Sequence, residues 1–377
     1  MKIGYDGKRA FHNFRGLGNY SRLMIEGLDQ FAPQNQYHLF TPDFKSKRAM
    51  DWQKSLSDQV ITHTPKTFLS KISQSLWRRS QLAYLSESLE LDIFHGLSHE
   101  LPIGIERTKV KSVVSMHDLI FMRYPEFFPW IDRFTYKRKF THSVEVADCV
   151  LAICEQTKRD LIEFLNVPES KIKVHYQSCD PHFYNRVSDE FKEDVRKKYE
   201  LPRSYILSVG AIEQRKNALS LVKAFDKVKN KINEDLVLVG NGKAYKEQIV
   251  DYISKNNLEN RVRILHGIPF SELPAFYQMA KLFCFPSHFE GFGIPLIESL
   301  FGGTPVLTSM GSCFPETVGE DQLFIDPNRI ESIEDGLLQL LTNEDLRLEK
   351  LSLGMKHVEK FRIENTTKKL LDLYREV

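Results

Sequence analysis

The segment 286–303 combines acidic residues and glycines in a pattern that suits a hydroxyl-rich ligand. It reads PSHFEGFGIPLIESLFGG, and seven residues separate Glu290 from Glu298. The apolar run 282–285 predicts a strand before it, and Pro295 predicts the first turn of a helix. The amides at such a helix start attract phosphate, and glycine lets a backbone approach a ligand closely. Because two carboxylates repel phosphate, we expect them to accept hydrogen bonds from sugar and ribose hydroxyls. The alternative is an ordinary strand–loop–helix with solvated acids.

Two adjacent cations follow the predicted strand 205–209. Arg215 and Lys216 lie in VGAIEQRKN, directly before a predicted helix. Cations at the carboxyl end of a strand can hold a diphosphate and stabilise the charge that develops when it leaves. The alternative is a solvated charge pair. Their place at a strand end favours the binding function.

A histidine follows another predicted strand. His117 comes after the strand 110–115, where it could donate to a sugar hydroxyl or to developing charge. His95, His99 and Glu100 follow the predicted strand 92–94 and could line an acceptor pocket or be ordinary loop residues, and we expect His99 to be an ordinary loop residue. Gly16 and Gly18 are too few for a dinucleotide fingerprint. They predict either a flexible backbone loop beside a bound phosphate or a plain structural turn.

Composition excludes several classes of protein. The 377 residues are 42% hydrophobic and 27% charged, with a net charge of +2, which describes a water-soluble globular chain of two domains. The five cysteines form no C-x-x-C pair and no Asp-x-Asp triplet occurs, so we expect reduced thiols, no metal and no other cofactor. No nucleic-acid-binding module is recognisable. With neither a signal-like apolar region nor a run of about 20 apolar residues, we expect a cytoplasmic protein.

Short apolar runs alternate with amphipathic stretches along the whole chain. This alternation predicts βαβ units with parallel sheets, and hence an α/β fold. The pattern restarts after the charged stretch 180–203, where we place the linker. We expect one domain over 1–180, a second over 181–355, and a C-terminal helix over 356–377. In such sheets ligands lie beyond the carboxyl ends of the strands.

These motifs together resemble glycosyltransferase family 4, a retaining group with the GT-B fold. Glu290 and Glu298 are similar to its E-x7-E motif, and VGAIEQRKN to its G-x4-R-K-N element. SMHDLIFMRYPEFFP, at 115–129, is similar to a segment of mannosyltransferase-like bacterial members. GSCFPETVGEDQLFIDP, at 311–327, is similar to one that closes the donor site. The resemblance covers nearly the whole chain. It implies two Rossmann-like domains with parallel sheets facing a central cleft. The domain over 1–180 would be on the acceptor side, the domain over 181–355 would bind the nucleotide sugar, and the helix over 356–377 would cross back to the first domain.

The resemblance also implies site residues. The catalytic group would be His117 near the anomeric carbon, Arg215 and Lys216 on the diphosphate, and Glu290 on the transferred sugar. Glu298 would accept hydrogen bonds from the ribose. The remaining donor-binding positions are glycines and amide-bearing residues of the matched loops: Gly16, Gly18, Gly210, Gly267, Ile268, Gly291, Phe292, Gly293 and Ile294.

The implied activity is transfer of a hexose from a nucleotide diphosphate sugar to a glycan or lipid-linked acceptor in bacterial surface polysaccharide synthesis, such as lipopolysaccharide. Mannose from GDP-mannose is the leading donor. The alternatives are a UDP-sugar, a nucleotide-sugar epimerase or phosphorylase on the same fold, and a non-catalytic binding protein.

Two basic segments with aromatic residues raise the question of a membrane partner. They cover 65–79 and 133–140, and the second reads RFTYKRKF. Such segments are either solvated helix faces or faces that rest on anionic lipid, which would make the protein peripheral on the inner face of the membrane.

Overall fold

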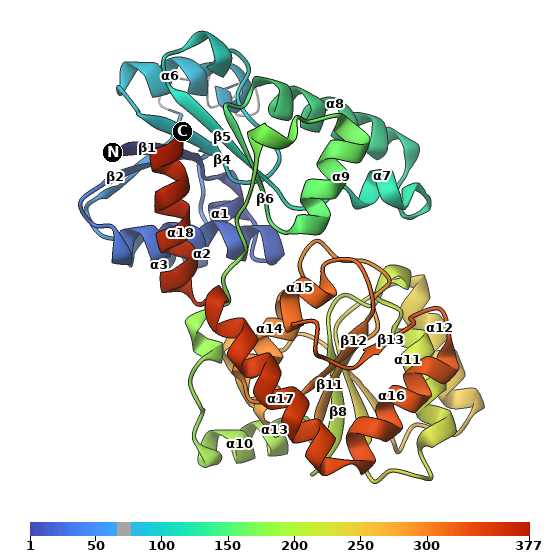
Figure 1. Cartoon of the computed structure of the whole chain (residues 1–377). Helices are drawn as coiled ribbons and strands as arrows, with labels where there is room; N and C mark the ends of the chain where they lie inside the picture. Colours follow the sequence, from blue (N-terminus) through green and yellow to red (C-terminus); the bar gives the residue numbers. More distant parts are fainter. Residues whose placement is uncertain (66–76) are drawn as a thin grey trace. The chain divides into compact units, whose positions relative to one another are not determined.

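The computed structural model describes residues 1–65 and 77–377 (Figure 1). The chain divides into two compact units. The first comprises Met1–Ser178 together with Phe361–Val377, and the second is Cys179–Lys360. Most of the basic segment 65–79 lies outside the described residues, so its predicted contact with lipid has no structural counterpart here. None of the helices in the described ranges combines the length and the apolar character that crossing a bilayer requires.

The first unit is built on a parallel sheet. In the described residues it has seven strands in the order β3-β2-β1-β4-β5-β6-β7. These are β1 Lys2–Asp6, β2 Gln36–Phe40, β3 Val60–His63, β4 Ile93–Gly96, β5 Lys111–Met116, β6 Cys149–Ala152 and β7 Ile172–Val174. Neighbouring residues of one strand face opposite sides of a sheet. Val113 and Val114 accordingly belong to different apolar clusters, so this sheet is covered on both faces.

The second unit repeats the plan with a second parallel sheet. Within the described part of the chain its order is β10-β9-β8-β11-β12-β13. The strands are β8 Tyr205–Val209, β9 Asp235–Val239, β10 Val262–Leu265, β11 Leu282–Phe285, β12 Val306–Ser309 and β13 Phe324–Ile325. The strand order reverses direction between β8 and β11, which pair in parallel. In open sheets of this kind, ligands bind at that point.

Helices follow the strands in both units (Figure 1). The first unit contains α1 Lys8–His12, α2 Gly16–Phe31, α3 Lys47–Lys54, α6 Leu82–Ser88, α7 Ile120–Arg123, α8 Trp130–Val146, α9 Glu155–Leu165 and α18 Ile363–Glu376. The second contains α10 Asp189–Tyr199, α11 Ala218–Val228, α12 Ala244–Lys255, α13 Leu273–Met279, α14 Ile294–Phe301, α15 Phe314–Val318, α16 Ile330–Thr342 and α17 Glu344–Val358.

The last helix, α18, belongs to the first unit although it ends the chain. It packs along α2, as Figure 1 shows with the red and blue helices. A Cβ on Gly27 of α2 would lie 2.3 Å from Thr367 Oγ1 of α18, so glycine allows the close approach. Leu370 and Tyr374 are buried in the core beneath it.

Three features differ from the sequence-based expectations. The short edge strand β3 was not predicted, because its residues are only half-buried and its apolar signal is weak. The charged stretch that we expected to be a linker contains the helix α10. Ser188 caps the N-terminus of this helix, because its side chain accepts a hydrogen bond from Phe191 N. The segment 356–377 is not a single helix, since α17 runs to Val358 and the extended backbone of Arg362 precedes α18.

Candidate active site

The second unit brings Glu290, Arg215 and Lys216 into direct contact. Glu290 follows β11, and both cations follow β8, the neighbouring strand. Glu290 Oε2 lies 2.9 Å from Arg215 Nη1, and Glu290 Oε1 lies 2.7 Å from Lys216 Nζ. The sequence predicted all three at one site, but not that the carboxylate bridges the two cations.

Burial and charge act in opposite directions on Glu290. Its side chain is 11% exposed, and burial raises its pKa. The positive charges of Lys216 and Arg215 outweigh burial and lower the pKa from 4.5 to about 2. The carboxylate is therefore ionised at neutral pH and keeps both cations in fixed positions. A second acid, Glu213, lies 2.6 Å from Arg215 Nη2 but is much more exposed.

Polar side chains hold the Glu290 loop in place. Ser287 Oγ donates to Glu290 Oε1 over 2.8 Å, and Ser312 Oγ donates to the Glu290 carbonyl over 3.1 Å. Thr317 Oγ1 and Cys313 Sγ both donate to the carbonyl of Phe292. Sequence reasoning did not single out these four residues. The available signal was their position inside the two matched segments, 286–303 and 311–327.

The turn into α14 depends on glycine. Gly293 is the N-cap with φ of +93°, a backbone conformation that other residues adopt only under strain. Pro295 lies in the first turn, as predicted, and Ile294 is the first helical residue. Phe292 is buried, whereas Gly291 is half-buried. The first amides of α14 have no partner within the helix and carry partial positive charge.

Glu298 lies one turn into α14, where the sequence placed it. Tyr277 Oη donates to its Oε2 over 2.7 Å, which leaves Oε1 without a protein partner among the described residues. Burial raises the pKa of Glu298 to about 7, while the Tyr277 hydrogen bond opposes the rise and the charge of Asp180 adds to it. Glu290 and Glu298 therefore differ sharply: one is held ionised, and the other titrates near neutral pH.

Gly210 lies at the end of β8 beside the cluster. Its φ is +156°, and a Cβ there would lie 3.1 Å from Lys216 Cδ. The neighbouring loop, VGNGK, packs backbone to backbone against it, because a Cβ on Gly240 would lie 1.8 Å from Gly210 O. A Cβ on Gly242 would likewise lie 2.2 Å from Ile212 O, so both glycines of this segment, residues 239–243, allow close loop packing.

Gly267 and Ile268 follow the edge strand β10. Gly267 is exposed with φ of +71°, and Ile268 is half-buried. Strands β9 and β8 lie between β10 and β11 in the sheet. The two residues thus occupy the same end of the sheet as the cluster but lie apart from it.

Gly16 and Gly18 open the helix α2, so the prediction of a flexible loop there is wrong, whereas their place beside a donor phosphate stays a prediction. Both residues lie within the first turn of α2. A Cβ on Gly18 would lie 1.6 Å from Asn13 O, whereas one on Gly16 would meet nothing within 4 Å. Gly18 therefore allows the first turn of α2 to pack against the preceding turn. Gly16 lies exposed at the N-terminus of the helix.

His117 follows β5 directly and is buried in the first unit. Its Nε2 lies 2.9 Å from the carbonyl of Leu97, so Nε2 carries a proton that is already donated. Nδ1 faces Gln177 Nε2 at 3.5 Å. Burial lowers the pKa of His117 to about 4. The hydrogen bond to Leu97 raises this pKa, whereas the positive charge of Arg9 lowers it. The ring is therefore neutral at pH 7, and Nδ1 is a hydrogen-bond acceptor. The predicted donation from His117 to a sugar hydroxyl is not available from Nε2, because that nitrogen donates to Leu97.

The other histidines nearby are structural. His99 Nε2 accepts from His117 N over 3.0 Å, and its ring stacks on Phe140 at 4.3 Å. His95 contacts Tyr374 and Ser115 through its two ring nitrogens. The expectation that His99 is an ordinary residue agrees with these contacts.

Two family models and several known proteins match this chain. Residues 14–183 match the family model described as Glycosyltransferase Family 4, and residues 190–352 match the model described as Glycosyl transferases group 1. The chain is 29% identical to the O-antigen chain mannosyltransferase B of Escherichia coli, over 100% of both chains. It is 27% identical to the serotype-specific mannosyltransferase WbdA of Escherichia coli over 97% of this chain, but spans only 46% of that protein.

The fold has solved counterparts. The structure of Alr3699/HepE from Anabaena in complex with UDP-glucose superimposes with a TM-score of 0.77 and 15% identity, covering 100% of both chains. At this identity the match concerns the fold alone. It confirms the predicted GT-B class of two Rossmann-like halves with parallel sheets.

Proposed function

We propose that this chain, which belongs to the family 4 glycosyltransferases, transfers a mannose residue from GDP-mannose to a glycan or lipid-linked acceptor in surface polysaccharide synthesis. The observation that carries the proposal is the bridge from Glu290 to Arg215 and Lys216 at the carboxyl ends of β8 and β11. The names of the E. coli relatives support mannose as the sugar and O-antigen as the product.

Each group of the cluster has a chemical task in this proposal. Arg215 and Lys216 bind the donor diphosphate and stabilise the negative charge that grows as it leaves. The Glu290 carboxylate holds both cations before the donor arrives and accepts hydrogen bonds from the sugar. Glu298 accepts from the ribose through Oε1, since Tyr277 occupies Oε2. The amides of Gly293 and Ile294 lie at the start of α14, where negative charge is favoured.

We propose that transfer retains the anomeric configuration. The bond from the sugar C1 to the diphosphate oxygen breaks, and the acceptor hydroxyl oxygen bonds to C1 on the same face. The acceptor proton passes to the leaving phosphate oxygen, so no protein nucleophile is needed. Early reaction products examined by proton NMR should carry the α-configuration of the donor. Products with the β-configuration would exclude this pathway.

The activity is tested with purified enzyme, α-linked mannotriose and GDP-mannose, with UDP-glucose in a parallel reaction. We expect mass spectrometry to detect addition of one or more hexoses from GDP-mannose. Glu290→Gln should abolish the addition, whereas Glu247→Gln, an exposed position on α12, should not change it. The second candidate donor is a UDP-sugar; the Anabaena protein of the same fold was solved with UDP-glucose. Addition from UDP-glucose alone would select that candidate.

The helix α8 supports a peripheral membrane contact. Its first turns expose Trp130, Ile131 and Phe134 by 69%, 58% and 67%, and the basic residues of 133–139 follow. Such a face suits the boundary of an anionic bilayer. We expect the protein to bind phosphatidylglycerol vesicles and to release them as salt rises. Trp130→Ala should weaken binding, while Tyr84→Ala, 71% exposed on α6, should not. Equal binding by both variants would exclude α8 as the contact.

A further inference from the structure

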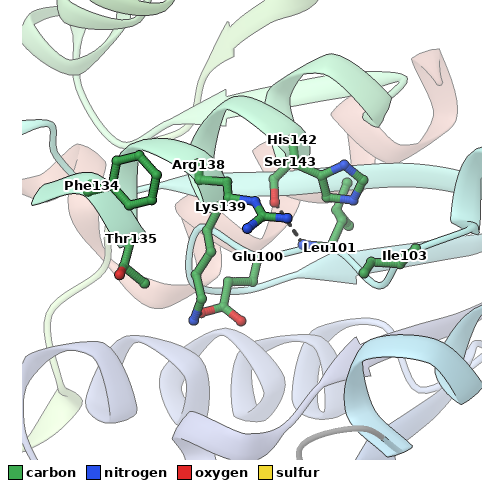
Figure 2. A pocket seen from close by; sticks show the side chains of 9 residues that line it. All are labelled: Glu100, Leu101, Ile103, Phe134, Thr135, Arg138, Lys139, His142 and Ser143. Carbon is green, nitrogen blue, oxygen red and sulfur yellow. Dashed lines mark hydrogen bonds and ion pairs between the residues drawn. The ribbon is translucent and has the colours of Figure 1, made fainter. Parts of the chain in front are cut away.

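Cations hold two of the acidic side chains that follow strands in this fold. One is Glu290, with its two cations in the second unit. The other is Glu100 of the first unit, which pairs with Lys139 at 2.9 Å and with Arg78. Figure 2 shows the Lys139 side chain reaching Glu100, where both residues line a pocket of about 420 Å³. Glu298 differs from both acids, because no cation in the described part of the chain pairs with it.

The hydroxyl of a tyrosine takes the place of a cation at Glu298. Tyr277 Oη, on α13, donates to Glu298 Oε2, on α14, over 2.7 Å. Burial raises the pKa of Tyr277 well above 10, and the charge of Glu298 adds to the rise. The hydroxyl therefore keeps its proton at neutral pH and remains a donor to the carboxylate.

Tyr277 is itself held on several sides. Its side chain is fully buried, and its ring packs edge-on against Phe183 and Phe283, with ring centroids 5.7 Å and 5.2 Å away. Its backbone carbonyl accepts a hydrogen bond from Thr304 Oγ1, a buried group in the loop after α14. These contacts fix the position of the hydroxyl before any ligand is present.

The hydrogen bond leaves the other carboxylate oxygen for a ligand. Glu298 is half-buried, and its Oε1 has no protein partner among the described residues. Because Tyr277 fixes Oε2, the carboxylate cannot turn freely, and Oε1 keeps one direction. A ligand hydroxyl binds more tightly to such an acceptor, since the acceptor has already lost its freedom. With no cation beside it, the carboxylate would repel phosphate, so the ligand group that it suits is a hydroxyl.

We infer that Tyr277 is a positioning residue that turns Glu298 Oε1 toward the ribose of the bound nucleotide, and that it thereby sets the preference of the site for a sugar with both ribose hydroxyls. Tyr277 acts through Glu298 and not on the ligand. The inference deepens the proposed function and rests on it in one respect, which is that the second unit binds a nucleotide.

The test compares GDP with 2′,3′-dideoxy-GDP, which lacks both ribose hydroxyls, by calorimetric titration. Wild type should bind GDP about tenfold more tightly, because the dideoxy sugar leaves the carboxylate without its partner. In Tyr277→Phe, which loses a single oxygen atom, the ratio of the two Kd values should fall below about threefold, because the carboxylate is free to turn. A purely structural role would weaken both nucleotides equally and leave the ratio unchanged. If UDP binds more tightly than GDP, UDP and 2′,3′-dideoxy-UDP form the pair.

Tyr205→Phe is the matched control. Tyr205 is buried in the same unit, and its Oη donates to the carbonyl of Phe276 over 2.7 Å. This variant therefore loses a buried tyrosine hydrogen bond without changing the contact to Glu298, and it should keep the wild-type ratio. A wild-type ratio in Tyr277→Phe, or an equal fall in both variants, would overturn the inference.

Glu298→Gln gives a second reading that does not depend on the folding of Tyr277→Phe. If Tyr277 orients this side chain, its hydroxyl holds the amide oxygen and turns the amide nitrogen, which cannot accept, toward the ribose. The ratio should then fall below about threefold. A wild-type ratio would show that the amide turns freely and would overturn the inference while nucleotide binding stands. Binding of neither GDP nor UDP by wild type would instead reject the proposed function, and the inference with it.

Discussion

Glu290 Oε1 lies 2.7 Å from Lys216 Nζ, although the two residues are 74 positions apart in sequence. The contact exists because β8 and β11 are neighbours and each delivers its following loop to the same edge of the sheet. Since Arg215 shares the same carboxylate, one acid holds two cations in place. Under the proposed function, those cations would bind the donor diphosphate and Glu290 would also contact the transferred sugar.

Removing the charge of Glu290 should therefore harm catalysis more than folding. Glu290→Gln keeps an acceptor for Ser287 but leaves Arg215 and Lys216 without their shared counter-charge. We expect kcat/KM for transfer to fall by about 100-fold or more. Thermal or urea unfolding should show a loss of about 1–3 kcal/mol. Transfer at near the wild-type rate would contradict the role of Glu290.

The raised pKa of Glu298 should make stability depend on pH. Its pKa is about 7 in the folded protein and near 4.5 when solvated, so folding favours the protonated form. That stabilisation, about 3 kcal/mol, is complete below about pH 4.5 and is lost as pH rises through 7. Glu298→Gln keeps a partner for Tyr277 and cannot ionise. We expect unfolding curves from pH 5 to 8.5 to show a smaller decline for this variant. Identical slopes for variant and wild type would contradict the assignment.

The two glycines of the first turn of α2 should respond oppositely to alanine. Gly18→Ala places a methyl group against Asn13 O and should destabilise the protein by about 1–3 kcal/mol. Gly16→Ala meets no atom within 4 Å and should be neutral or stabilising by about 0.5–1 kcal/mol. Unfolding midpoints in urea measure both. An equal loss of stability in the two variants would contradict this explanation. It would indicate that both glycines are needed for the same backbone turn or the same ligand.

Cys154 should be replaceable by serine. Its Sγ accepts from Thr157 N over 3.3 Å and caps the N-terminus of α9. Oxygen is the stronger acceptor, so Cys154→Ser should match or exceed the wild-type stability. Cys154→Ala loses the cap and should cost about 1 kcal/mol. A serine variant less stable than the alanine variant would show that sulfur is needed for packing instead.

Much of the fold was predictable because its signals are local. The strands β8 and β11 are short apolar runs, and the sequence located both at their observed bounds, 205–209 and 282–285. Gly293 and Pro295 likewise predicted the start of α14. The contacts across the sheet were not predictable in the same way. The bridge from Glu290 to Lys216, the donation from His117 Nε2 to Leu97, and the packing of Gly18 on Asn13 all depend on which segments become neighbours.

Arg215, Lys216 and Glu290 are proposed to form the site of the donor diphosphate. Thermal stabilisation by nucleotides tests this proposal most directly. The melting temperature would be measured with GDP, UDP, ADP and NAD at matched concentrations, for wild type, Lys216→Ala and the exposed control Lys255→Ala. A ligand present at about 100 times its Kd raises the free energy of unfolding by about 2.7 kcal/mol. Each kcal/mol raises the melting temperature by about 2–4 °C. We predict this shift with GDP for wild type and Lys255→Ala, and its loss in Lys216→Ala. An equal GDP shift in all three proteins, or a shift with NAD alone, would contradict the account.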